Sequence, residues 1–313
     1  MAELTAKAKS KKYMRGRLST GDRIFDYVNI FIMCLLVIVT LYPFINTLAV
    51  SFNNPQDSIK GGIYLWPRIW TIENYEYVFG EASIYHATLI SVLRTAIGTV
   101  ITVFCSAIVA YTISRDDYVL RKFVTVAFIL TMYFSGGLIP EFLLMRDLHL
   151  IKTFWVYILP GMIGVFNLII IRSFIYGLPD SILESARIDG AGEFRTFFSI
   201  VLPLCMPVLA TVALFTAVYQ WNAWFDVFLY NSSIEKLSTL QYELQKILAS
   251  SNATTGAISV GDAMSRGAAG GTTVTPLSVR ATMTIVASVP IIMVYPFLQK
   301  YFVKGMMVGG VKG

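Results

Sequence analysis

Long apolar stretches with almost no charge constrain this chain more than any other feature. Six of them, each 18 to 29 residues long, cover positions 27–50, 88–114, 123–140, 153–171, 197–225 and 281–299. A helix needs about 20 mostly apolar residues to cross a bilayer. Only 14% of the residues are charged and 56% are hydrophobic, whereas an ordinary soluble domain has about 25% charged residues. The sequence therefore predicts an all-α integral membrane protein with six transmembrane helices, and it excludes a soluble or disordered chain.

The distribution of Lys and Arg predicts which way the chain crosses the membrane. Sixteen of the 25 lie in the four segments on the N-terminal side of the bilayer, and eight lie in the longer segments on the other side. Because cytoplasmic loops collect Lys and Arg, we expect both termini in the cytoplasm. The net charge of +6 then reflects topology, and we expect no nucleic-acid partner. The remaining cation, Arg94, is expected to extend outward from its span toward water.

These spans divide the chain into segments with different expected roles. The predicted segments are a basic cytoplasmic tail (1–23), a first transmembrane helix (24–50), an external segment (51–87), a membrane core (88–304) that includes a cytoplasmic segment (177–203) and an external loop (226–280), and a cytoplasmic C-terminal tail (305–313). Within the external loop, positions 234–248 have a helical pattern. A tract rich in Ser, Thr, Gly and Ala follows at 250–275 and is expected to be flexible.

Sites for catalysis, nucleotides or metals are not recognisable in this sequence. No G-x-x-x-x-G-K-[ST] loop is present to bind nucleotide phosphates. His86 and His149 are isolated, so we predict no metal site. The three cysteines lie in apolar stretches and indicate no disulfide framework. We therefore predict no catalytic residue and no cofactor on this chain.

The cytoplasmic segment 177–203 has the pattern of a structured element. Ser181 and Glu184 have capping-box spacing, which predicts a helix beginning at Ser181. Gly190 is a natural stop for that helix, and a second short helix is expected from about Glu193 to residue 200, before Pro203. An amphipathic loop between spans and a docking surface for a partner are both compatible with this pattern.

The same segment resembles the EAA loop of ABC importer permeases. The family pattern is E-A-A, three residues, G, nine residues, I-x-L-P, and positions 184–203 match its spacing throughout, with Ser185 in place of the first Ala. The resemblance implies that this loop docks on a separate ATPase. It assigns ATPase coupling to Glu184, Ser185, Ala186, Asp189, Gly190 and Ala191. We expect the small residues to let the first helix enter a cleft on the ATPase, and Glu184 to cap that helix.

Other stretches resemble the carbohydrate-uptake, maltose-type branch of these permeases. They cover 66–75, 220–225 and 300–313, while 135–140 and 242–248 are most similar to the polysaccharide-type subgroup. The resemblance implies the type-1 ABC importer permease fold in the plasma membrane of a prokaryote. The implied partners are a homologous second permease as a heterodimer, an ABC ATPase dimer that carries ATP and Mg, an external solute-binding protein, and an oligo- or polysaccharide substrate.

Polar and aromatic residues in or near the spans are candidates for the substrate path. Polar groups are costly in a membrane and tend to be functional there. The candidates are Asn46, Tyr133, Asn167, Tyr219, Gln220, Trp221, Asn222 and Trp224. Interfacial aromatic belts and helix-to-helix hydrogen bonds explain such residues equally well. An ion-coupled secondary transporter is the alternative function, but the spans contain no carboxylate or histidine for coupling. A membrane-embedded enzyme is weaker still, because no site residues are visible.

Overall fold

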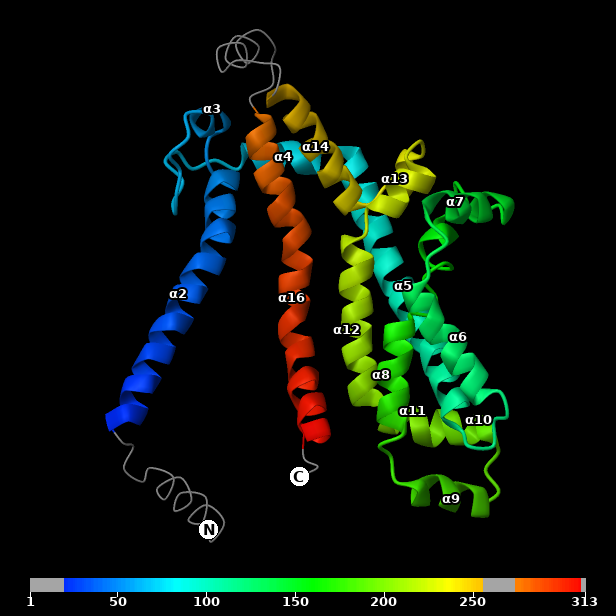
Figure 1. Cartoon of the computed structure of the whole chain (residues 1–313). Coiled ribbons are helices and arrows are strands. Elements are labelled where there is room, and N and C mark those ends of the chain that lie inside the picture. The colour runs from blue at the N-terminus through cyan, green and yellow to red at the C-terminus, as the bar shows by residue number, and fades with distance from the viewer. Residues whose placement is uncertain (1–19, 256–273, 311–313) are drawn as a thin grey trace.

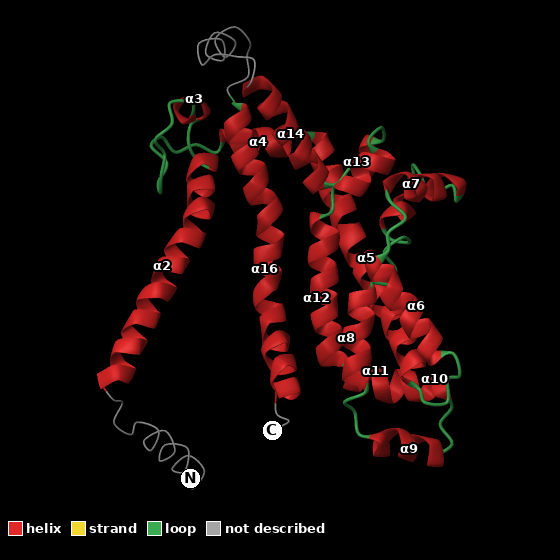
Figure 2. Ribbon diagram, viewed as in Figure 1, coloured by secondary structure: helices red, strands yellow, loops and turns green. Residues whose placement is uncertain are grey.

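A computed structural model describes residues 20–255 and 274–310, and helices make up nearly all of this part of the chain (Figure 1). Three helices are long and apolar enough to cross a membrane: α2 (Thr20–Ser51), α5 (Ala82–Ser114) and α16 (Pro276–Gly310). Figure 2 shows helices joined by loops throughout; the described residues add one isolated bridge, between Asn53 and Trp70. A helix satisfies its own backbone hydrogen bonds, as a chain in lipid requires.

Three further spans are counted only if each of three sharply bent pairs of helices is taken as one span. The first pair is α6 (Arg121–Tyr133) with α7 (Leu138–Asp147), which are bent by 120°. In the second pair, α8 (Val165–Ile175) meets α9 (Asp180–Ile188) at 77°. The third joins residues 193–204 to α12 (Met206–Asn222), also at 77°. The described chain thus has three long helices by length and composition, or up to six spans if each bent pair is counted.

The third and fourth predicted spans differ most from the structure. The stretch 123–140 is broken at 134–137, where Gly137 has φ +88°. The stretch 153–171 contains a short 3-10 helix, η1 (Phe154–Tyr157), and then an irregular segment before α8 begins. Pro and Gly residues in both stretches cause the breaks, because they interrupt helices without adding charge. An uninterrupted helix over either stretch was therefore a wrong expectation.

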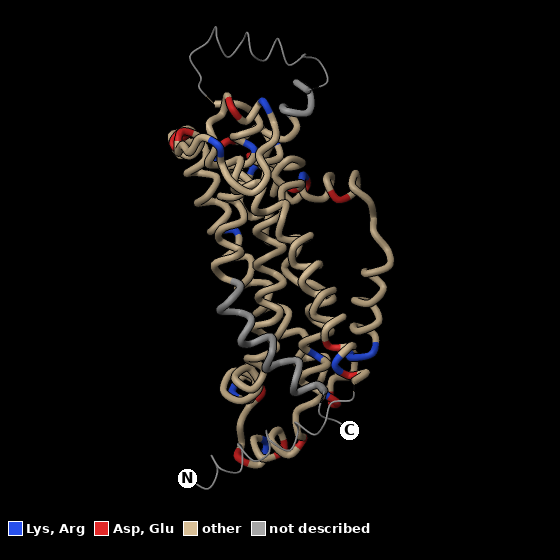
Figure 3. Tube along the Cα trace, turned by 90° about the vertical axis from the view of Figure 1, so that its left-hand side faces the viewer, with Lys and Arg blue, Asp and Glu red and all other residues tan. Residues whose placement is uncertain are grey.

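Shorter helices cover both ends of the bundle (Figure 1). At one end lie α3 (Pro55–Ser58), α4 (Glu73–Gly80), α13 (Phe225–Asn231), η3 (Glu235–Leu237) and α14 (Leu240–Thr255). At the other end lie α9, α10 (Glu193–Thr196), the π-helix η2 (Phe197–Val201) and α11 (Leu202–Leu204). Figure 3 shows charged residues gathered at these two ends, with a largely uncharged middle. The helical pattern at 234–248 is confirmed from Leu240 onward by α14, whereas Glu235–Leu237 form the separate 3-10 helix η3. α14 continues to Thr255, so the start of the tract 250–275 is helical and not flexible as expected, and most of the rest, 256–273, lies outside the described residues.

The interior packing centres on α5, which contacts both α8 and α12. A core cluster at one end joins α5, α8, η2 and α12 through residues such as Ala110, Ile171, Phe197 and Val212. Two other clusters join α4, α14 and α16 to α5, and α7 and η1 to α13. In contrast, the apolar window of α2 has none of its residues buried within this chain. The tails at 1–19 and 311–313 lie outside the described residues.

Candidate functional site

The segment 177–203 folds as a helix, a glycine turn and a second helix. At the end of α9 the N–H of Ala191 donates to the carbonyl of Ala186 at 2.9 Å, and the N–H of Gly190 donates to Arg187 O at 3.0 Å. These two bonds form a Schellman motif, which closes a helix with a left-handed residue. Gly190 has φ +73°, and a Cβ built on it would meet nothing within 4 Å. The predicted turn is confirmed, and it requires glycine for backbone conformation, not for space.

Hydrogen bonds and salt bridges connect both helices of this segment to the end of α5 and to the loop that follows it. The carboxylate of Glu193 in α10 accepts a hydrogen bond from the Tyr111 hydroxyl at 2.5 Å and another from Arg115 at 3.0 Å. Arg187 in α9 pairs with Asp117 at 2.9 Å. Exposed pairs of this kind contribute about 0–1 kcal/mol each, so the position of the segment depends on several weak contacts together.

Three expectations for α9 are wrong. The helix begins at Asp180, one residue earlier than predicted, and no side chain caps its first N–H groups. Glu184 therefore does not form a capping box, and it is exposed. Ala186 is buried against its own chain, because Leu183 and Ala186 face the same core side of α9. Ala186 is thus not available to a partner, whereas Ser185, Asp189 and Gly190 are exposed and Ala191 is half-buried.

Two large apolar side chains of the segment point into solvent and were missed by the sequence analysis. Ile188 is 85% exposed and Phe194 is 84% exposed, one on each side of the glycine turn. Exposure alone does not mark a partner surface in a chain with many exposed apolar groups, but these two lie on both sides of one turn at a charged end of the bundle (Figure 3). The sequence could have indicated them by position, because both are large apolar residues within four positions of Gly190 in a short segment between spans.

Arg94 does not extend outward toward water, as was expected; it is 1% exposed and bound inside the chain. Its Nε donates to Gln220 Oε1 at 2.8 Å, and its Nη1 donates to Asp226 Oδ1 at 3.0 Å and to Ala223 O at 3.2 Å. Its guanidinium also lies 4.7 Å from the ring centre of Tyr157. A charge can remain buried when a counter-charge and further hydrogen bonds satisfy it. Asp226, at the start of α13, supplies that counter-charge.

A cavity of about 330 Å³, called here the outer cavity, opens between α7, α12 and α13. Its polar and aromatic lining includes Glu141, Tyr219, Asn222, Trp224, Asp226 and Tyr230. No Lys, Arg or His is among the described residues that line it. Burial and, to a lesser extent, the carboxylates of Glu141 and Asp226 together raise the pKa of Tyr230 to about 12. The outer cavity thus offers aromatic faces and hydrogen-bonding groups, with the Glu141 carboxylate in its lining and Asp226 paired with Arg94.

A second cavity of about 360 Å³, called here the inner cavity, lies between α5, α8 and α12. It is lined by neutral groups that include Thr102, Gly161, Asn167, Thr216, Tyr219 and Gln220. Asn167 Nδ2 donates to Thr216 Oγ1 at 3.2 Å across α8 and α12. Tyr219 is exposed and lines both cavities. A ligand with many hydroxyl groups would find aromatic surface and amide groups in these two cavities.

Five of the eight candidate path residues line the two cavities, namely Asn167, Tyr219, Gln220, Asn222 and Trp224. The other three have different surroundings. The Trp221 indole N–H donates to Ala287 O at 2.9 Å, which fastens α12 to α16. Asn46 donates to two carbonyls of the external segment. Tyr133 lies exposed at the end of α6. Whether any of the eight contacts a substrate stays a prediction.

The outer cavity also contains residues that were not among the candidates. Glu141 and Tyr230 both line it, and they come from short helices outside the predicted spans. In the sequence, the only sign that Glu141 and Tyr230 could belong to a site is that they are polar residues near the ends of predicted spans. Metal binding has no support in the part of the chain that the structure describes, where no three His, Cys, Asp or Glu residues lie together as ligands would.

Comparison with known proteins identifies the family. The family model described as the binding-protein-dependent transport system inner membrane component matches residues 118–308. The polygalacturonan/rhamnogalacturonan transport system permease protein YtcP of Bacillus subtilis (strain 168) is 36% identical over 292 residues, which are 93% of this chain and 99% of that protein. Protein LplC of the same organism is 36% identical over 294 residues, 94% of this chain and 96% of LplC.

A more distant relative and a solved structure agree with this result. The arabinooligosaccharides transport system permease protein AraQ of Halalkalibacterium halodurans is 30% identical over 285 residues, 89% of this chain and 93% of AraQ. A crystal structure of a bacterial ABC transporter involved in the import of the acidic polysaccharide alginate includes a chain with 26% identity and a TM-score of 0.81, covering 92% of this chain and 99% of that chain. The chain therefore belongs to the family of binding-protein-dependent transport system inner membrane components, and as an ABC transporter permease subunit it is not itself an enzyme.

Proposed function

We propose that this chain is one of two permease subunits of an ABC importer that takes up an oligo- or polysaccharide delivered by an external binding protein. Relatives named for polygalacturonan, arabinooligosaccharide and galactooligosaccharide transport support the substrate class. The inner and outer cavities support it chemically, because aromatic faces and amide groups suit the CH faces and hydroxyls of sugars. The observation that carries the importer assignment is the glycine turn at Gly190 between two short helices fixed to the α5 loop.

Coupling to the ATPase is assigned to the exposed side of the 177–203 segment. Ile188 and Phe194 would enter an apolar recess of the ATPase, while Glu184 and Asp189 would pair with its basic groups. ATP and Mg would bind the partner ATPase and not this chain. The second permease would be a different, homologous chain, as in maltose-type systems.

A bulky residue at Gly190 tests this assignment. Gly190→Val is expected to abolish transport and weaken ATPase association while the protein stays in the membrane, because a β-branched residue at φ +73° costs roughly 1–2 kcal/mol. The matched control is Gly190→Asn, since Asn tolerates the left-handed region and the site is open. Glu184→Lys should also abolish transport. The measurements are uptake by the reconstituted transporter and pull-down of the ATPase; a fully active Gly190→Val transporter would refute the coupling role.

Uptake that persists without any ATPase would instead favour the ion-coupled alternative.

The proposed topology has six spans, with both termini in the cytoplasm of a prokaryotic plasma-membrane protein. The three long helices, with α6, α8 and α12 from the three bent pairs, support six crossings, and the Lys and Arg asymmetry supports the orientation. A cysteine at position 60 should react with an impermeant reagent from outside, and cysteines at 185–195 should react only from inside. External labelling of residues 185–195 would contradict this orientation.

A further inference from the structure

The external segment after α2 folds into a rigid loop that returns toward the membrane. Gly61 and Gly62 both have positive φ, +70° and +71°, so the chain reverses here in a way that other residues rarely adopt. The residues after this turn run back alongside the upper part of α2 (Figure 1). There the Asn46 side-chain amide donates to Ile63 O at 2.7 Å and to Tyr64 O at 3.0 Å. The loop tip is therefore fixed beside a turn of α2 that precedes the helix end.

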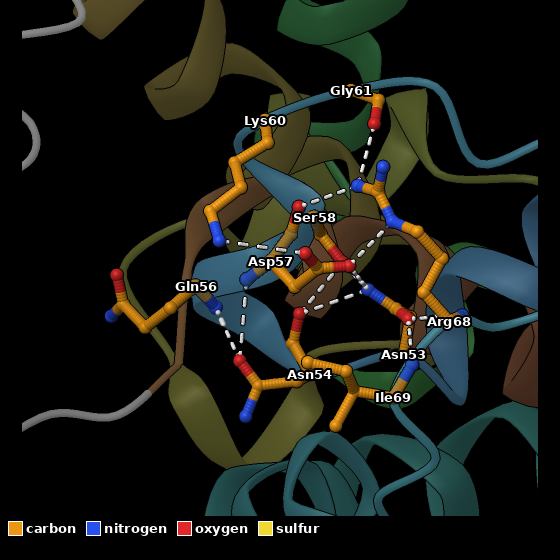
Figure 4. Close-up of polar contacts among 9 residues, drawn as sticks. All are labelled: Asn53, Asn54, Gln56, Asp57, Ser58, Lys60, Gly61, Arg68 and Ile69. Carbon is orange, nitrogen blue, oxygen red and sulfur yellow. Dashed lines mark hydrogen bonds and ion pairs between the residues drawn. The ribbon is translucent and has the colours of Figure 1, made fainter.

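A buried polar frame holds this loop in shape (Figure 4). Asn53, which is fully buried, accepts hydrogen bonds from the backbone N–H of Arg68 and Ile69 at 2.8 and 2.9 Å. Its amide donates to Asp57 Oδ2 at 3.1 Å. Arg68 donates from Nε to the same carboxylate oxygen at 2.8 Å and from Nη2 to Gly61 O at 2.7 Å. These contacts connect the two arms of the loop, so its tip cannot move independently of its base.

The depth of the tip follows from its position along α2. Asp26 is the last charged residue of this helix, and Asn46 lies 20 residues further on. At 1.5 Å per residue this is about 30 Å, the thickness of the hydrocarbon core. With Asp26 at the inner boundary, this rise reaches at most the outer boundary between hydrocarbon and headgroups, and any tilt of α2 lowers it. Ile63 and Tyr64 therefore lie at that boundary or just below it.

The side chains at the tip are aromatic or apolar, and they are uncovered. Tyr64 is 66% exposed, Leu65 57% and Trp66 71%. Trp66 packs edge-on against Trp70, with ring centres 5.3 Å apart. No charged residue lies between Gly61 and Arg68, and Arg68 is paired with Asp57. Trp and Tyr favour the membrane interface because each has an apolar body and a polar group.

We infer that residues 64–66 form an interfacial anchor that inserts into the outer lipid leaflet, with the headgroup and upper acyl-chain region of the bilayer as its partner. The frame around Asn53 holds the anchor at a fixed depth, so the external end of α2 has a fixed height in the membrane. The tip points back along α2, away from the end of the molecule that carries α3 and α14 (Figure 1). A protein delivered from the external solution would meet that other end first.

Tryptophan quenching in the assembled transporter tests this inference. The complete transporter, with this chain and its partner chains, is placed in nanodiscs whose lipids carry bromine either near the top of the acyl chain or near its terminal methyl group. The contribution of Trp66 is the emission lost in the Trp66→Phe variant. We expect shallow bromine to quench most of that contribution and deep bromine to quench it much less. The matched control is Trp224→Phe, because Trp224 lines the outer cavity and its contribution should respond weakly to either lipid.

Every outcome decides the question. Strong quenching by shallow bromine supports the anchor, whether or not aqueous iodide also reaches Trp66. Quenching by iodide alone would place the tip in water and overturn the inference. Protection from both quenchers would also overturn it, because the tip would then be covered by the second permease or the binding protein. The test does not depend on which substrate is transported.

Discussion

Gly98 on α5 is the residue where a single added atom has the clearest consequence. A Cβ at this position would lie 2.8 Å from Gln220 Nε2 and 3.0 Å from its Cδ. Gln220 cannot move freely, because its Oε1 accepts from the buried Nε of Arg94. The absence of a side chain at Gly98 therefore leaves room for the Gln220 side chain, which accepts a hydrogen bond from Arg94 in addition to the Arg94–Asp226 ion pair.

Substituting this glycine should destabilise the protein even though alanine favours helices. Gly98→Ala would gain about 0.5–1 kcal/mol of helix propensity but lose a hydrogen bond to a buried charge, which is worth about 1.5–3 kcal/mol. We expect net destabilisation of roughly 1–2 kcal/mol, measured as a lower Tm of the transporter in nanodiscs. Gly80→Ala is the control, since a Cβ there meets nothing within 4 Å. Equal Tm values for Gly98→Ala and the wild type would refute this account of the Arg94 site.

Among the elements, the external loop around Asn53 is the one whose stability should depend on pH. The hydrogen bond from Asn53 and then the bond and charge of Arg68 hold the pKa of Asp57 below its usual value near 3.8. A lowered folded-state pKa stabilises the loop above the unfolded value, and that stabilisation is lost as the pH falls through the folded value. The loop should therefore be fully protected at neutral pH, begin to lose protection as the pH falls below about 4, and open only below the lowered pKa of Asp57.

Hydrogen exchange over residues 51–71 measures this opening. Wild-type protection should fall on acidification, whereas Asp57→Asn should be less protected at neutral pH and change little on acidification. Glu76→Gln, at an exposed position on the neighbouring helix α4, should behave as the wild type. Acid-insensitive protection of wild-type residues 51–71 would show that the carboxylate does not stabilise the frame.

Helix existence could be predicted from this sequence, but helix continuity could not. Apolar length alone predicted α2, α5 and α16, because a long charge-free run has few other ways to satisfy its backbone. The residues at the breaks near Gly137 and Gly161 are uncharged, so the length of an uncharged stretch does not reveal them. The turn at Gly190 was predictable since it depends on local backbone conformation. The burial of Ala186 was not, because it depends on which face of α9 packs against the core.

At the scale of the whole molecule, α2 is the long helix that this chain covers least, although it contacts α16. None of its apolar window is buried, and its lower part diverges from α16 (Figure 1). A photo-crosslinking residue at Leu36 in the purified transporter should therefore cross-link to the second permease subunit, as identified by mass spectrometry. The same residue at Val208, buried in α12, should react only within this chain. Cross-links from Leu36 exclusively to lipid would contradict this contact.

The candidate site brings together residues that are far apart in the sequence, so its composition could not be predicted from local patterns. The pairing of Arg94 with Asp226 joins residues 132 positions apart, and no local pattern identifies such a partner. The outer cavity likewise combines Glu141 from α7 with Trp224 and Tyr230 near α13. The sequence could indicate polar residues near the external ends of spans, but only the arrangement of the helices shows which of them face a common space.

The short helices have a consequence for how the chain is made. α8 has 11 residues and α6 has 13, or about 16 and 20 Å of helix, against a hydrocarbon thickness of about 30 Å. Neither can settle across the bilayer by itself as it leaves the ribosome, because its ends would remain in lipid with unsatisfied backbone groups. Both α6 and α8 therefore need neighbouring segments to complete their crossing. The long helix α5 contacts both of them and is synthesised before either one. The order of helices along the chain thus provides a template helix before the helices that need one.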